Sequence, residues 1–90
     1  MLLVKKTSQF KTDYKKVQRS GRHDMQALKT VMEKIRNQES LEEKYHDHPL
    51  KGEHQDLRDC HIEGDWLLLY RIDGDTVVFI RLGTHSELFG

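Results

Sequence analysis

The chain has 90 residues, of which 36% are hydrophobic, and its formal net charge is zero. A chain of this length buries roughly two thirds of its unfolded surface, so residues 1–90 are expected to form one small domain. The sequence has no run of about 18 apolar residues, which excludes a membrane-spanning helix. The single cysteine, Cys60, has no disulfide partner in the chain, which fits the reducing cytoplasm.

The charges are unevenly distributed along the chain. Residues 1–22 carry seven Lys and Arg residues against Asp13 alone, a net charge of +6. Residues 23–65 carry six basic and eleven acidic residues, a net charge of −5. This uneven charge has two interpretations: a face that attracts a phosphate backbone, or a helix face exposed to solvent. From charge alone we favour the solvent-exposed helix face.

Residues 2–21 predict a strand followed by a helix. The segment "LLVKKT", residues 2–7, is typical of a short strand. A helix is expected to begin at Ser8 and to end at Ser20 and Gly21, since glycine is common just after a helix. Apolar residues recur on one face of this helix: Phe10, Tyr14 and Val17.

A second helix follows, because Asp24 can accept hydrogen bonds from the first turn of a helix. Its apolar face consists of Leu28, Val31, Met32 and Ile35. Two consecutive helices with one apolar face each are expected to pack on a shared sheet. Residues 40–56 contain the only proline and no sustained periodicity, which predicts an ordered loop. The loop is expected to be held by three side chains, Leu41, Tyr45 and Leu50.

Three strand-like runs complete the chain, over residues 57–62, 66–72 and 76–82. The turn sequences "EGD" and "DGD" lie between them and predict two hairpins. The predicted order is therefore β-α-α-β-β-β. This is an α+β fold with two helices packed on one face of a small, largely antiparallel sheet.

Alternation along the strands predicts which residues face the helices. In the last strand the helix side is expected to carry Val78, Ile80 and Leu82. The opposite, open side is expected to carry Val77, Phe79 and Arg81. In the first run of the hairpins, Asp59 and His61 share one side, and the other side carries Arg58, Cys60 and Ile62.

Five residues are candidates for chemistry: His48, His61, Asp65, Arg81 and His85. They lie in the predicted loop, at the end of a strand, in a turn, in the last strand and just after it. Taken singly, each has a structural explanation: a histidine that bonds a loop backbone, a His–Asp pair, or an arginine paired with a carboxylate.

Three separated segments carry a resemblance: "DHPLKG", "LRDCHIEGDWLLLYRI" and "RLGTHSELFG". Together they resemble the YafQ-type toxins of the RelE superfamily, which are bacterial ribosome-dependent messenger-RNA endonucleases neutralised by an antitoxin. The predicted order of elements agrees over the whole chain. The resemblance implies a cytoplasmic type II toxin without a cofactor. Its implied partners are a cognate antitoxin, the ribosome and mRNA, with operator DNA bound only through the antitoxin complex.

Carried over by residue, the resemblance implies a catalytic set of His48, His61, Asp65 and His85. It also implies three substrate-binding residues, Arg81, Trp66 and Phe89. Two of these have alternatives, since Trp66 is equally expected in the core and Phe89 equally expected to anchor the chain's end to the sheet.

These residue types suit RNA cleavage by the substrate's own 2′-hydroxyl. The reaction needs a base for that hydroxyl, an acid for the departing 5′-oxygen and positive charge for the phosphate oxygens. Histidine supplies both proton-transfer roles near neutral pH, and arginine complements the phosphate. We hypothesise that His48 and His85 include the acid–base pair, with either residue as the base. Asp65 would orient an imidazole, and His61 would bind phosphate or share in proton transfer.

The first helix carries basic residues away from its apolar face. These residues are predicted to contact ribosomal RNA: Lys11, Lys15, Lys16 and Arg19.

Two other function classes remain. One is a metal-binding enzyme, although the spacings HExxH and paired CxxC are absent. Its ligands would come from His46, His48, His54, His61, Asp65 and His85. The other class is a module that binds an antitoxin without catalysing a reaction.

Overall fold

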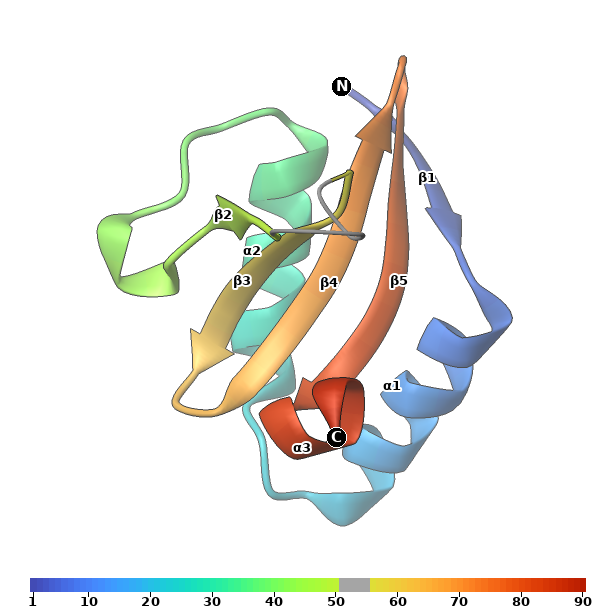
Figure 1. Ribbon diagram of the computed structural model, residues 1–90, viewed down its shortest axis with the longest axis vertical. Helices are drawn as coiled ribbons and strands as arrows, with labels where there is room; N and C mark the ends of the chain where they lie inside the picture. Colours follow the sequence, from blue (N-terminus) through green and yellow to red (C-terminus); the bar gives the residue numbers. More distant parts are fainter. Residues whose placement is uncertain (51–55) are drawn as a thin grey trace.

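The computed structural model describes residues 1–50 and 56–90. These residues form, in chain order (Figure 1), β1 (Leu3–Lys6), α1 (Ser8–Ser20), α2 (Met25–Arg36), the 3₁₀ helix η1 (Glu43–Tyr45), β2 (His48–Pro49), β3 (Arg58–Glu63), β4 (Trp66–Asp73), β5 (Thr76–Thr84) and α3 (His85–Phe89). The described strands make one five-stranded sheet in the order β1-β5-β4-β3-β2. Strand β1 is parallel to β5, and the other pairs are antiparallel.

The predicted α+β class and the largely antiparallel sheet are confirmed, as are the two hairpins. The structure adds three short elements that the predicted order lacks: η1, β2 and α3. Among the described residues no helix is long and apolar enough to cross a bilayer.

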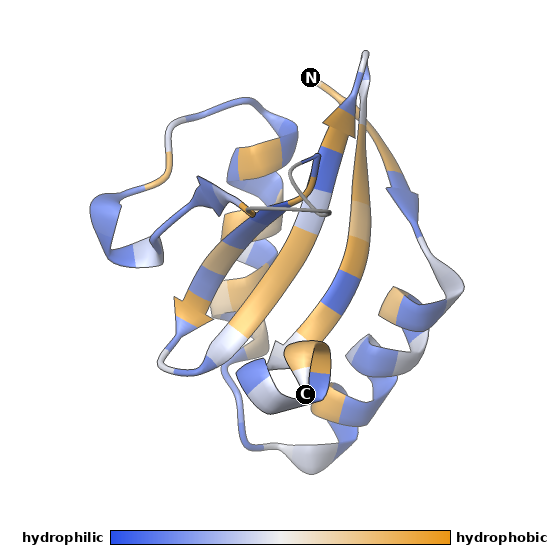
Figure 2. Cartoon of the chain, viewed as in Figure 1, coloured by the Kyte–Doolittle hydropathy of each residue, from blue (hydrophilic) through white to orange (hydrophobic). Residues whose placement is uncertain are grey.

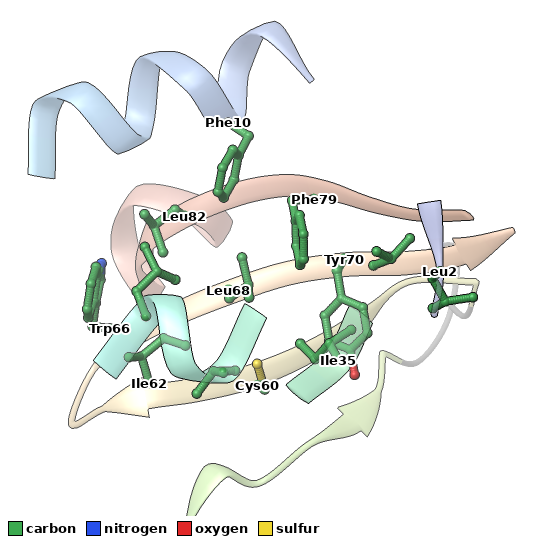
Figure 3. Packing of buried hydrophobic residues seen from close by; sticks show 13 residues of the cluster. Leu2, Phe10, Ile35, Cys60, Ile62, Trp66, Leu68, Tyr70, Phe79 and Leu82 are labelled. Atoms are coloured by element: carbon green, nitrogen blue, oxygen red, sulfur yellow. The ribbon is translucent and has the colours of Figure 1, made fainter. Parts of the chain in front are cut away.

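Core residues of α1 and α2 pack together on one face of the sheet. Figure 1 shows α2 behind the sheet, α1 alongside β5, and α3 at one end of the opposite face. Figure 2 shows hydrophobic residues along most of β4, the central strand. In Figure 3, Phe10 reaches from α1 toward Phe79 of β5, and their ring centroids are 5.8 Å apart. The core joins residues of both helices, and Leu2 just before β1, to three strands: Leu2, Phe10, Leu28, Val31, Ile35, Cys60, Ile62, Trp66, Leu68, Tyr70, Val77, Phe79 and Leu82.

Both helices begin at side-chain caps. The Thr7 hydroxyl accepts from the Phe10 amide and donates to the Ile80 carbonyl of β5 at 2.7 Å, so it fixes the start of α1 against the sheet. The Asp24 carboxylate accepts from two amides at the start of α2, as predicted.

The predicted faces of β5 are partly wrong, because the strand contains a β-bulge. Leu69 of β4 lies opposite Arg81, whereas the next residue, Tyr70, lies opposite Phe79. The extra residue, Ile80, shifts the alternation. As a result Val77 and Phe79 lie in the core instead of on the open side, while Leu82 faces the helices as predicted.

The predicted loop over residues 40–56 is ordered where the structure describes it. Leu41 and Tyr45 pack against the core, as predicted. Leu50 is half-buried, and its amide donates to the Leu57 carbonyl at 2.9 Å. Residues 51–55, with the end of the "DHPLKG" segment and His54, lie outside the described residues.

Candidate active site

Three histidines far apart in the sequence meet on the sheet face opposite α1 and α2. Short strand β2 brings His48 beside Asp59 of β3, and Nε2 of His48 lies 4.0 Å from a carboxyl oxygen of Asp59. Nε2 of His61, also on β3, lies 3.8 Å from the other oxygen of that carboxyl group. The ring of His85 from α3 lies 5.5 Å, centroid to centroid, from the ring of His61. We call these four residues the histidine cluster.

The floor of the histidine cluster is apolar. Asp59 lies opposite Leu69 and His61 lies opposite Leu67 in the pairing of β3 with β4, and both leucines are buried. The three histidines differ in exposure. About half of the His48 and His85 side chains is exposed, whereas His61 is only 24% exposed. His48 and His85 are therefore the histidines that a substrate in solution reaches most easily.

Asp65 fixes the ring of His85. Gly64 takes a positive φ of 51° in the β3–β4 turn, a conformation that glycine adopts at little cost, and Asp65 follows it. One oxygen of Asp65 accepts from the His85 amide at 3.2 Å and contacts Nδ1 of the same residue. These bonds from His85 hold the pKa of Asp65 below its usual value. With Nδ1 directed at Asp65, Nε2 of His85 is left for proton transfer.

The predicted catalytic set did not include two residues of this region: Asp59, and His46, which the sequence offered only as a ligand of the metal-binding alternative. Asp59 is only 3% exposed, and its Oδ1 has no hydrogen-bond partner among the described residues. The ring of His46 lies 5.3 Å from that of His61. The alternation that places Asp59 on the same side as His61 was the available signal for Asp59.

Part of the histidine cluster has the geometry of a metal site. Among the described residues, His48, Asp59 and His61 each offer a ligand atom, and the three atoms lie within 4.8 Å of one another. Imidazole nitrogen and carboxylate oxygen are ligands that zinc and copper accept. His54, another residue of the metal prediction, lies outside the described residues.

Comparisons with known proteins identify the family of the chain. Residues 2–90 match the protein family described as the bacterial toxin of a type II toxin–antitoxin system, YafQ. The chain belongs to this YafQ toxin family. The mRNA interferase toxin YafQ of Escherichia coli K12 is 40% identical over 88 residues, which cover 97% of this chain and 95% of that protein.

Solved structures of YafQ-family toxins have the same fold. The toxin in the crystal structure of the E. coli DinJ–YafQ complex is 37% identical, with a TM-score of 0.90 over the whole of both chains. A metal-bound toxin from Helicobacter pylori is 40% identical, with a TM-score of 0.91 over 99% of this chain and 100% of that one.

In this YafQ-family toxin Arg81 is held by α1. Its Nε and Nη2 donate to Asp13 at 2.8 and 3.3 Å, and Asp13 also accepts from the Leu82 amide at 3.0 Å. Burial opposes ionisation of Asp13, but the hydrogen bonds from Arg81 and Leu82 outweigh it and lower the pKa of Asp13. Binding of a phosphate by Arg81 stays a prediction. It would use the N–H groups of Arg81 that do not donate to Asp13.

Trp66 belongs to the core, which confirms the structural alternative for this residue. It is 1% exposed and lies on the helix-covered face, where its ring stacks on His23 at 4.5 Å (Figure 3 shows Trp66 within the core). The burial of the ring argues against the predicted stacking of Trp66 on a nucleotide.

Phe89 differs from Trp66. Its side chain is 47% exposed, and its ring lies 6.2 Å from that of His85. Its role toward substrate stays a prediction, and the exposure argues against a buried anchor for the chain's end.

The predicted basic residues all lie exposed on α1: Lys11, Lys15, Lys16 and Arg19. A hollow of about 330 Å³ on this surface is lined by Thr12, Lys15, Lys16 and Arg19. Nζ of Lys16 also lies 3.0 Å from Glu87 of α3, so the basic helix contacts the short helix that carries His85.

Proposed function

We propose that this YafQ-family toxin is a ribosome-dependent endoribonuclease, which cleaves mRNA by acid–base attack of a 2′-hydroxyl on the adjacent phosphate. The observation that carries the proposal is the convergence of His48, His61 and His85 from three separate elements on one face of the sheet. Curated relatives bear the name mRNA interferase toxin, which supports the same activity.

The histidine cluster has the groups that this reaction requires. One imidazole removes the proton of the 2′-hydroxyl, and a second donates a proton to the departing 5′-oxygen. A positioned acid or base typically contributes about 10²–10⁴-fold, so two histidines account for much of the chemical acceleration. His48 and His85 are assigned to these roles because they are the exposed members of the cluster.

The carboxyl groups orient the imidazoles. Asp65 accepts a hydrogen bond from Nδ1–H of His85, which fixes the ring and turns its Nε2 outward. The Asp59 carboxylate lies between the rings of His48 and His61, so it orients both rings toward one place on the sheet. His61 is assigned to the phosphate oxygens or to a share in proton transfer.

The substrate meets the protein beyond the histidine cluster as well. Phe89 offers an exposed ring beside His85, and stacking of a base on such a ring contributes about 1–3 kcal/mol. The basic surface of α1 is assigned to ribosomal RNA, and action on ribosomes places the toxin in the cytoplasm. The DinJ–YafQ complex of E. coli supports a cognate antitoxin as a further partner, with operator DNA bound through that complex.

A cleavage assay on ribosomes that translate a defined mRNA tests the proposal. His85→Ala should lower the cleavage rate by at least about 100-fold, the lower range for a positioned acid or base. The matched control is His23→Gln, which removes an imidazole from the helix-covered face and should retain cleavage. Full activity of folded His85→Ala would refute the assignment. Inactivity of the wild type would instead favour a binding module.

A metal-dependent enzyme is the second candidate, because His48, Asp59 and His61 can share one ion. A relative from H. pylori was solved with metal bound. Chelation by 1,10-phenanthroline in the presence of excess Mg²⁺ removes transition metals but keeps ribosomes intact. Activity that survives this treatment would exclude the second candidate, whereas activity restored only by Zn²⁺ or Cu²⁺ would establish it.

A further inference from the structure

The catalytic assignment of His85 depends on a helix that is too short to be stable alone. Helix α3 spans five residues, His85–Phe89, and isolated helices of fewer than about 12 residues are marginal in water. Phe89 at its end is half exposed and contributes little burial. The position of His85 therefore depends on the contacts that hold the start of α3.

Glu87 makes three of those contacts. Its Oε1 accepts from the Thr84 amide at 2.9 Å, while its own amide donates to the Thr84 hydroxyl at 3.3 Å, which together form a capping box. Its Oε2 accepts from Nζ of Lys16 on α1 at 3.0 Å. The side of α3 that carries His85 is held separately by Asp65.

The backbone of β5 also lies close to Glu87. A Cβ atom placed on Gly83 would come within 3.2 Å of the Glu87 carboxyl oxygen and 3.4 Å of Cβ of Glu87. The side chain of Glu87 therefore packs directly against the backbone of β5 at Gly83.

We propose that Glu87 is a positioning residue for His85, which it holds in the histidine cluster by closing the capping box of α3. The inference rests on the proposed function, since it gives His85 a part in the chemistry. The cap is the decisive contact and the ion pair is secondary, because Lys16 is 73% exposed and an exposed ion pair contributes little. Hydrogen bonds from Thr84 and Lys16 lower the pKa of Glu87 to about 2, so the carboxylate stays ionised at any pH used for assay.

The test compares two substitutions at Glu87. Loss of a cap lowers the equilibrium constant between the formed and the unfolded helix end by about 5–30-fold. Because kcat follows the fraction of molecules with α3 formed, Glu87→Ala should lower kcat by up to that factor while KM stays within about twofold. Glu87→Gln should keep kcat within about threefold, since glutamine also closes a capping box. Glu33→Ala, which removes an exposed glutamate from α2, is the matched control.

Amide hydrogen exchange supplies a second readout that needs no ribosome. In Glu87→Ala the Thr84 amide should exchange faster than in the wild type, while core amides such as that of Leu68 keep their protection. A general loss of stability would instead accelerate both amides.

Two results would overturn the inference. One is a kcat of Glu87→Ala equal to that of the wild type, and the other is an equal loss in Glu87→Gln and Glu87→Ala. Failure of the proposed function is distinguishable, because the wild type would then be inactive while the exchange of the Thr84 amide still reports whether Glu87 caps α3.

Discussion

The ion pair between Asp13 and Arg81 should stabilise the fold as a coupled unit. Asp13→Ala removes the carboxylate that receives two N–H groups of Arg81 and the Leu82 amide of β5. Strand β1 pairs with β5 only from Thr76 to Phe79. Beyond that point the Asp13 carboxylate of α1 accepts the hydrogen bond from the Leu82 amide at the edge of β5. The substitution therefore affects both a charge pair and a sheet edge.

The expected cost follows from burial. Removal of one partner of a buried ion pair costs about 3–5 kcal/mol. The Asp13 side chain is 9% exposed but Arg81 is 32% exposed, so water compensates part of the loss at Arg81. We expect Asp13→Ala to lower the free energy of unfolding by about 2–4 kcal/mol. For a chain of this size that corresponds to a fall of about 10–25 °C in Tm.

A double-mutant cycle with Arg81→Met isolates the pair. The interaction energy between the two positions should be about 1–3 kcal/mol, measured by urea unfolding with fluorescence of the buried Trp66, the only tryptophan. Asp73→Ala, at an exposed aspartate of β4, serves as the control and should change stability by less than about 0.5 kcal/mol. An interaction energy below about 0.5 kcal/mol would refute the coupling.

The same pair predicts a pH dependence. The pKa of Asp13 is lowered from its ordinary value of 3.8, so its contribution is fully present above that pH. As the pH falls through the lower pKa of the folded state, the carboxylate is protonated and the contribution is lost. The stability difference between the wild type and Asp13→Ala should therefore shrink below about pH 3.8 and stay constant above about pH 5.

Three further predictions concern other parts of the molecule. Gly83→Ala should lower kcat several-fold without unfolding the chain, because the new Cβ displaces Glu87 and Leu88 of α3 by a few tenths of an ångström; unchanged cleavage kinetics would contradict it. Native Cys60 should react with a thiol reagent only as fast as the chain unfolds, because it is buried and burial raises the pKa of its thiol; fast labelling of the folded chain would contradict this. Replacement of three basic residues of α1 by Gln should weaken ribosome association and remove much of its salt dependence: Lys15, Lys16 and Arg19. Sedimentation with ribosomes at two salt concentrations measures this, and an unchanged salt dependence would argue against this surface.

Local patterns were sufficient to predict the larger elements. The apolar spacing of α1 and α2 predicted both helices, and Ser8 and the cap at Asp24 predicted where they begin. Glycine turns between apolar runs predicted both hairpins. These features depend on residues near in sequence, so their physical cause is visible in the sequence itself.

The features that were missed depend on tertiary context. The bulge at Ile80 reversed the predicted faces of Val77 and Phe79, and no turn residue marks it. Helix α3 was missed because five residues are too few for periodicity, although the capping box between Thr84 and Glu87 was visible as "THSE".

The candidate site was predictable in part. The resemblance indicated the three histidines and Asp65, which the structure brings together. It gave no indication that Arg81 would pair with Asp13, because those residues are 68 positions apart. The place of Asp59 between two histidines likewise required the pairing of β2 with β3.

The chemical identity of the cleaved ends tests the central claim most directly. If imidazoles of the histidine cluster activate the 2′-hydroxyl of the mRNA, the products carry a 2′,3′-cyclic phosphate and a 5′-hydroxyl, and a 2′-deoxy nucleotide at the cleavage position blocks the reaction. Products with a 3′-hydroxyl and a 5′-phosphate, formed equally well at a 2′-deoxy nucleotide, would contradict this account and indicate attack by water.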